Sequence, residues 1–141
     1  MGPVIVRSGK SFHNEIVAGK HKLIADEPES AGGTDRGPTP YDLLSAGLGA
    51  CTSMTLHFLA KRDGIPLEGV EIRVTNDRMY AKDCADCASS SGYIHRFDVE
   101  IVLRGNLTPE QRERLLGAAK RCPVYKTLTS EIRIEERLVD A

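Results

Sequence analysis

One segment constrains the fold more than any other, because a helix start, a long apolar stretch and a helix stop follow one another in it. Thr39 is suited to cap a helix and Pro40 to occupy its first position. Asp42 stands where a capping-box acid reaches back to the backbone. Gly64 and Pro66 then end the segment. The sequence therefore predicts a single long helix between these signals.

The buried face of this helix is predicted to carry a cysteine. Residues at helical spacing form one stripe: Leu44, Leu48, Cys51, Thr55 and Phe58. Gly47 and Gly49 each cost about 1 kcal/mol relative to alanine in a helix interior, and they open a groove that a ligand or another backbone can approach. A cysteine on an apolar face is more often a small hydrophobe than a nucleophile. Cys51 also lies too far from the helix start for the dipole to lower its pKa, so a reactive Cys51 requires a nearby cation.

The rest of the chain alternates between strands and one further helix. Strands are predicted at residues 4–6, 12–17, 21–25, 70–74, 97–103 and 132–134. The second helix opens with a capping box at Thr108 and runs to Cys122, where Pro123 disturbs it. This order of elements predicts an α+β fold with helices packed on antiparallel sheet.

Composition narrows the function classes. The 141 residues suggest a single domain over residues 1–141. A formal net charge of −1 gives no electrostatic reason to expect nucleic acid as a partner. The apolar stretches fall short of the roughly 20 residues of a membrane span, so we expect no membrane partner and a cytoplasmic location. In that reducing compartment, four cysteines favour catalysis, redox sensing or metal binding over structural disulfides.

Cys122 differs from Cys51 in its expected surroundings. At a helix C-terminus the backbone field opposes a thiolate, so Cys122 is predicted to be a poor first nucleophile and a better resolving partner. Two separated thiols suit two-electron chemistry in which one sulfur attacks and the other resolves. A buried cysteine that merely ends an apolar stripe fits Cys122 equally well. The candidate cations for Cys51 are Arg36, which precedes the long helix and could fold back over it, and Arg7.

Cys84 and Cys87 form a C-x-x-C motif in a polar insert between two predicted strands. A redox-active motif of this kind needs a strand-to-helix context, which the insert lacks. A structural zinc needs four ligands; His95 could be a third, and a dimer mate could complete the set. Solvated thiols, a labile disulfide and a metal site all stay open for this pair.

Two segments resemble a known family. Residues 37–44 (GPTPYDLL), followed by residues 48–52 (LGACT), resemble the central-helix signature of the OsmC/Ohr superfamily, and residues 122–124 (CPV) resemble its second signature. The resemblance covers nearly the whole chain. It implies an OsmC-like α+β fold, with antiparallel sheets packed around a long central helix. It also implies an intertwined homodimer with active sites at the interface, and a peroxidase cycle without metal or flavin cofactors.

The resemblance also implies roles for single residues. Cys51 attacks the O–O bond of an organic hydroperoxide and becomes a sulfenic acid, Cys122 condenses with it to a disulfide, and a dithiol such as a lipoylated protein reduces that bond. Hydrogen peroxide is expected to be a poorer substrate. Arg36 and Asp42 complete the predicted catalytic set, and Asp42 serves either there or only as a helix cap.

This chain departs from the typical hydroperoxide-resistance members at two places. Those members carry a glutamate where Tyr41 stands, and an arginine beside a Gly-Gly turn where residues 8–10 read Ser-Gly-Lys, with Arg7 nearby. The chain is thus closer to the OsmC-like branch, whose members can carry a D-C-x-x-C insert like residues 83–87. The alternative function is that of a redox-sensing or small-molecule-binding protein of the same fold with little turnover.

Overall fold

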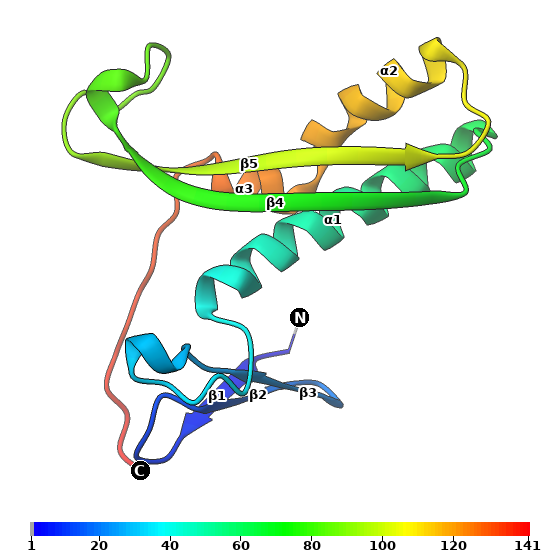
Figure 1. The fold of residues 1–141 in the computed structure, drawn as a ribbon. Helices are drawn as coiled ribbons and strands as arrows, with labels where there is room; N and C mark the ends of the chain where they lie inside the picture. The colour runs from blue at the N-terminus through cyan, green and yellow to red at the C-terminus, as the bar shows by residue number, and fades with distance from the viewer. Residues whose placement is uncertain (1) are drawn as a thin grey trace. The chain divides into compact units, whose positions relative to one another are not determined.

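The computed structural model describes residues 2–141 and divides into two compact units (Figure 1). The first unit runs to Ala46 and the second runs from Gly47 to Ala141. The long helix α1, Pro40–Asp63, begins in the first unit and continues through the second.

The first unit is a three-stranded antiparallel sheet followed by a tight loop. Strands β1 (Val4–Ser8), β2 (Asn14–Ala18) and β3 (His21–Ala25) pair in the order β1-β2-β3. All three predicted strands are confirmed, with bounds shifted by up to two residues. The loop contains a short 3₁₀ helix, η1 (Glu29–Ala31), and leads directly to α1.

A buried carboxylate organises this loop. Asp26, only 2% exposed, accepts hydrogen bonds from the Thr34 hydroxyl at 2.6 Å and from the backbone N–H groups of Glu27 and Arg36. The Thr34 hydroxyl, followed by these backbone donors, holds the pKa of Asp26 at about 2, although burial alone would raise it. At Gly33 an added Cβ would collide with the Glu27 carbonyl, so the loop can close only around glycine there.

The start of α1 confirms the predicted capping box. The Thr39 N–H donates to Asp42 Oδ2 at 3.0 Å, and the Asp42 N–H donates to Thr39 Oγ1 at 3.2 Å. Two backbone donors that the helix leaves without partners are thereby satisfied. The helix ends at Asp63, and Gly64 follows with φ of 66°, a conformation that glycine adopts at little cost.

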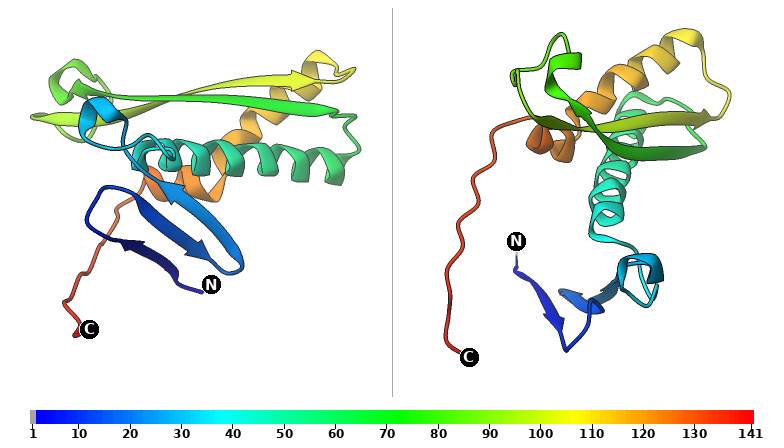
Figure 2. Two further views of the ribbon diagram at one scale, coloured as in Figure 1. Left: turned by 60° about the horizontal axis from the view of Figure 1, so that its bottom comes forward. Right: turned by 60° about the vertical axis from the view of Figure 1, so that its left-hand side comes forward.

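The second unit is built on a long antiparallel ribbon. Strands β4 (Gly69–Tyr80) and β5 (Tyr93–Arg104) pair without interruption, and a turn containing η2 (Ala81–Asp83) joins them (Figures 1 and 2). Both strands are longer than predicted. Helix α2 (Pro109–Ala118) follows, and its capping box, Thr108 with Gln111, is confirmed.

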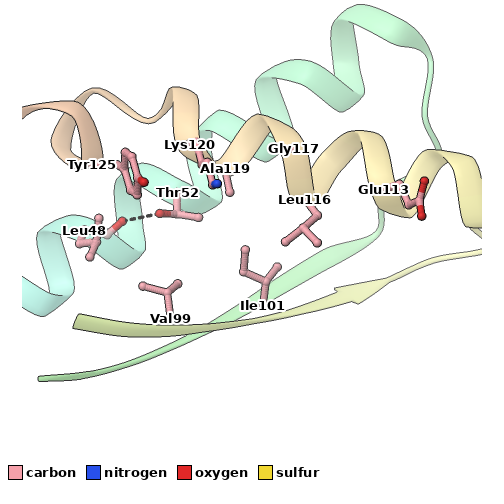
Figure 3. Close-up of a pocket in the computed structure, with 10 residues that line it drawn as sticks. All are labelled: Leu48, Thr52, Val99, Ile101, Glu113, Leu116, Gly117, Ala119, Lys120 and Tyr125. Carbon is pink, nitrogen blue, oxygen red and sulfur yellow. Dashed lines mark hydrogen bonds between the residues drawn. The ribbon is translucent and has the colours of Figure 1, made fainter. Parts of the chain in front are cut away.

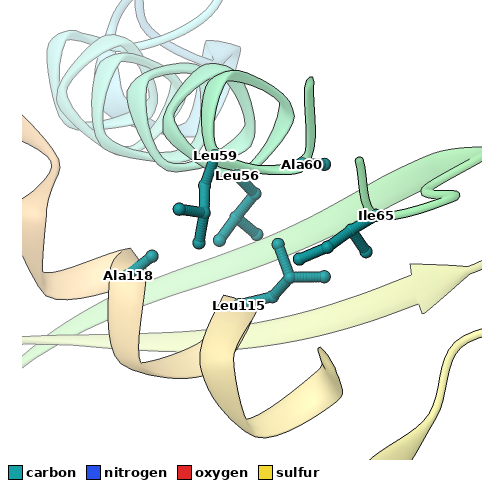
Figure 4. Close-up of a cluster of buried hydrophobic side chains, with 6 residues drawn as sticks. All are labelled: Leu56, Leu59, Ala60, Ile65, Leu115 and Ala118. Atoms are coloured by element: carbon teal, nitrogen blue, oxygen red, sulfur yellow. The ribbon is translucent and has the colours of Figure 1, made fainter. Parts of the chain in front are cut away.

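The core of this unit lies where α1 and α2 meet over the ribbon. Six buried side chains form it: Leu56, Leu59, Ala60, Ile65, Leu115 and Ala118 (Figure 4). The cross-strand pairs Val70–Leu103 and Ile72–Ile101 pack against them from one face of the ribbon. Because apolar residues of β4 and β5 alternate, one face of the ribbon is apolar throughout this contact.

The buried stripe of α1 differs from the prediction. Leu48, Thr52 and Leu56 are buried, whereas Leu44 and Phe58 are 46% and 70% exposed. The helix carries apolar residues on more than one face, and the ribbon and α2 cover only one of them. Among residues 2–141, α1 alone is long and apolar enough to cross a membrane by length and composition, a test that core helices also pass; 28% of the tested window is buried.

Two further predictions about the C-terminal part are wrong. Past α2 the chain does not continue as one helix to Cys122. It forms a 3₁₀ turn, η3 (Ala119–Arg121), and then a new helix, α3 (Pro123–Leu128). Within the described part of the chain, no strand forms at residues 132–134, which belong to an extended tail after α3 (Figure 2). A strand needs an edge to pair with, and the tail pairs with neither sheet.

Candidate functional site

Cys51 lies on α1 at the wall of an open cavity in the second unit. The side chain is partly exposed, and the cavity has a volume of about 540 Å³. Its lining is mainly apolar but includes two arginines: Cys51, Met54, Thr55, Phe58, Leu59, Arg62, Ala118, Arg121 and Pro123. A small molecule with an apolar body can therefore reach the Cys51 sulfur.

Cys122 occupies a helix N-cap, not the helix C-terminus predicted from the sequence. Its side chain is completely buried, and Sγ accepts a hydrogen bond from the Tyr125 N–H at 3.4 Å. Pro123 takes the first position of α3, where its missing N–H costs nothing. The backbone at this point therefore favours a negative charge on sulfur, which reverses the electrostatic reason for treating Cys122 as a poor nucleophile.

The two thiols interact directly, and their pKa values move in opposite directions. Burial, and next the hydrogen bond to Cys122, raise the pKa of the Cys51 thiol. Burial would also raise the pKa of Cys122, but hydrogen bonds from Cys51 and from the backbone N–H of Tyr125 outweigh it and lower that pKa. The hydrogen bond between the thiols therefore favours the proton on Cys51 and negative charge on Cys122 when one of the two ionises.

Two arginines at the cavity were not assigned to the site from the sequence. Arg62 donates to Asp63 at 3.0 Å, and Arg114 reaches the other oxygen of that carboxylate at 2.8 Å. Besides the hydrogen bond from Arg62, the second cavity arginine, Arg121, also helps to lower the pKa of Asp63. Because neither Asp63 nor any other acid is among the described residues that line the cavity, its rim is positively charged. Arg62 follows Cys51 by eleven residues, three helical turns on the same face, and this spacing could have identified it.

The other predicted site residues lie in the first unit. Arg36 lines a separate cavity there together with His13 and Lys22, and its backbone N–H donates to Asp26 at 3.2 Å. Asp42 is engaged in the cap of α1. Arg7 lies on β1. The predicted roles of Arg36, Arg7 and Asp42 toward Cys51 stay predictions.

The second unit contains another cavity, of about 600 Å³, whose wall includes sequence neighbours of both thiols (Figure 3). Leu48 and Thr52 of α1, Val99 and Ile101 of β5, and Tyr125 of α3 contribute to its wall. Thr52 follows Cys51 directly, and the Tyr125 backbone holds Cys122. The Thr52 hydroxyl in this wall donates its hydrogen bond to the Leu48 carbonyl at 2.8 Å. The cavity therefore presents mainly apolar surface to an occupant.

Cys84 and Cys87 form a disulfide in the turn between β4 and β5. Of the alternatives left open by the sequence, the structure contains the disulfide. Neither residue lines the cavity of Cys51.

Comparison with known proteins places these features in a family context. The sequence model described as "OsmC-like protein" matches residues 33–137, which include both free cysteines. Among curated protein sequences, none matches the chain.

Solved structures show the same fold. A putative osmotic stress induced and detoxification response protein from Psychrobacter arcticus is 20% identical with a TM-score of 0.71, and the match covers 90% of this chain and 88% of that one. An organic hydroperoxide resistance protein OsmC from Legionella pneumophila is 23% identical with a TM-score of 0.64, over 92% and 90% of the two chains. The organic hydroperoxide resistance protein OhrB of Bacillus subtilis is 27% identical with a TM-score of 0.62, over 90% and 89%.

Proposed function

This chain belongs to the OsmC-like protein family, and from that premise we propose that it is a thiol-dependent peroxidase that reduces organic hydroperoxides. One observation carries the proposal: two thiols share a hydrogen bond, with one open to a cavity and the other fully buried. The likeness to the Bacillus subtilis hydroperoxide resistance protein supports the substrate class.

Access, and not the backbone field, selects Cys51 as the attacking sulfur. The pKa of Cys122 is lowered, but its side chain has no exposed surface, so a peroxide cannot reach it. In the proposed first step Cys51 loses its proton to solvent, and its thiolate attacks the outer peroxide oxygen. The O–O bond breaks, the alkoxide takes a proton from solvent and leaves as an alcohol, and Cys51 becomes a sulfenic acid.

The second step uses Cys122 as the resolving thiol, because its lowered pKa favours loss of its proton to solvent. Its thiolate attacks the sulfenic sulfur of Cys51, the S–O bond breaks, and the leaving hydroxide takes a proton from solvent to form water. The resulting disulfide is reduced by thiol–disulfide exchange with a dithiol, which is itself oxidised. A lipoylated protein is one dithiol of this kind.

The cavity at Cys51 favours organic hydroperoxides over hydrogen peroxide. Met54 and Phe58 are each 70% exposed and can contact an apolar substrate body. Burying such a body contributes about 25 cal/mol per Å² of apolar surface, which hydrogen peroxide cannot supply. The positive rim at Arg62 and Arg121 stabilises negative charge as the thiolate and the alkoxide form.

The proposal includes a homodimer and a cytoplasmic location. Met54 and Phe58 lie on the face of α1 that the second unit leaves exposed, and the tail beyond Ser130 pairs with neither sheet. A second copy of the chain could cover both. A reducing compartment keeps the dithiol partner reduced, which the cycle requires.

A redox-sensing protein with little turnover is the second candidate. The raised pKa of Cys51 favours it, because a protonated thiol attacks peroxide slowly. The two candidates share the Cys51–Cys122 disulfide and differ in how fast it forms and is reduced.

Steady-state reduction of cumene hydroperoxide with dihydrolipoamide distinguishes them. We expect the wild type to turn over, Cys51→Ser to lose all consumption above the uncatalysed rate, and Cys122→Ser to stop after one sulfenic acid per chain. The control chain with Cys84→Ser and Cys87→Ser should retain turnover. If wild type and Cys51→Ser consume peroxide at the same slow rate, the peroxidase proposal fails.

A further inference from the structure

We propose that Cys84, Asp86 and Cys87 form a redox-gated metal site, which binds Zn²⁺ when both cysteines are reduced and is closed by the disulfide. The inference does not depend on the peroxidase function. It concerns the turn between β4 and β5, which the thiol pair of Cys51 and Cys122 does not use.

Three ligand atoms already converge in this turn. The two sulfurs and a carboxylate oxygen of Asp86 all lie within 4.8 Å of one another. The Cys84 Sγ lies 3.5 Å from Asp86 Oδ1. Two ligands of one tetrahedral zinc, at about 2.3 Å for sulfur and about 2.1 Å for oxygen, are separated by about 3.6 Å. The sulfur–oxygen pair is therefore spaced as two zinc ligands are, before any metal is bound.

The base of the turn is fixed in place. The Tyr80 and Tyr93 rings stack with centroids 4.8 Å apart, and the Ala81 N–H donates to the Gly92 carbonyl at 2.8 Å. Arg78 lies over the Tyr93 ring at 4.6 Å. A turn held in this way loses less conformational entropy when its side chains bind a ligand.

Charge favours a cation once the disulfide is reduced. Two thiolates beside the Asp86 carboxylate, with Asp83 one residue before Cys84, would repel one another. A divalent cation removes this repulsion and lowers the pKa of the thiols it binds. This mixed set of sulfur and oxygen ligands favours Zn²⁺ over Mg²⁺ and Ca²⁺, because the latter two ions bind through oxygen ligands. A water molecule can take the fourth position, because Asp86 is exposed and the cysteines are partly exposed.

Opening and closing the site requires only a dithiol reductant and a hydroperoxide oxidant. A dithiol reductant gives two electrons and two protons to the Cys84–Cys87 disulfide and becomes a disulfide itself. Zinc then displaces the two thiol protons. In the reverse direction a hydroperoxide takes two electrons from the bound thiolates and two protons from solvent, the S–S bond re-forms, the metal is released, and the peroxide leaves as alcohol and water.

Metal binding to the full chain tests the proposal. The chain carries Cys51→Ser and Cys122→Ser, so that only the turn offers thiols, and a phosphine without thiol groups reduces it. Zn²⁺ affinity is measured by competition with a chromophoric chelator, and Co²⁺ replaces zinc to detect sulfur-to-cobalt charge-transfer absorption. We expect one metal ion per reduced chain and none per oxidised chain.

Two carboxylate variants form the matched control. Asp86→Asn should weaken Zn²⁺ binding by about tenfold or more, whereas Asp83→Asn, outside the ligand cluster, should change it by less than about twofold. Cys84→Ser should abolish the charge-transfer band. Absence of binding by the reduced chain, equal binding by the oxidised chain, or equal losses in Asp86→Asn and Asp83→Asn would each overturn the proposal. If the reduced chain re-forms the Cys84–Cys87 disulfide but never binds metal, the two cysteines are a redox pair and not a metal site.

Discussion

Replacing Leu115 by alanine tests whether the core of the second unit is the contact between α1 and α2. Leu115 is completely buried against Leu56 and Leu59, whereas its neighbour Leu116 is 61% exposed. The substitution removes three carbon atoms, worth about 2.4 kcal/mol at about 0.8 kcal/mol each. The cavity left behind adds to this, so we expect the free energy of unfolding to fall by about 3–4 kcal/mol. Stabilities of single domains are about 5–15 kcal/mol, so the loss is a large fraction of the total.

Leu116→Ala removes the same atoms from the next position of the same helix and is the matched control. We expect it to lower the free energy of unfolding by less than about 1 kcal/mol. Urea denaturation of both variants, at one protein concentration and under reducing conditions, measures the two values. If Leu116→Ala proves as costly as Leu115→Ala, the assignment of the core from this chain is refuted, because a partner that covers Leu116 would then matter as much as α1.

Three further predictions concern stability. Asp42→Ala should lower the free energy of unfolding by about 1 kcal/mol in urea, because the Thr39 N–H loses its acceptor. Gly47→Ala should raise it by up to about 1 kcal/mol, since an added Cβ meets nothing within 4 Å, while Gly64→Ala, at φ of 66°, should lower it by about 1–2 kcal/mol. The lowered pKa of Asp26 contributes stability that is full above its unfolded value of 3.8 and is lost as pH falls toward about 2. Wild-type unfolding free energies should therefore fall over that range, and Asp26→Asn should flatten the dependence; an unchanged slope would contradict this role.

Local signals predicted much of the fold because they act within a few residues. Both capping boxes, at Thr39 and Thr108, form as expected, since each requires only residues three positions apart. The alternating strands also form, because the side-chain period of two is a property of the strand itself. The predictions that failed concern contacts with distant parts of the molecule. The exposed side of α1 at Phe58 and the unpaired tail at residues 132–134 can be buried or paired only by something that the sequence pattern does not specify.

The error at Cys122 has a different origin, because the signal was local and was assigned to the wrong helix. Proline can end one helix, but it is also favoured at the first position of the next. Pro123 does the latter, which makes Cys122 an N-cap although cysteine is not among the residues usually found there. The backbone then stabilises a thiolate at Cys122, where a helix C-terminus would have opposed it. The order of attack in the proposed cycle therefore depends on access: Cys122 is sealed although its pKa is lowered, whereas Cys51 is partly exposed although its pKa is raised.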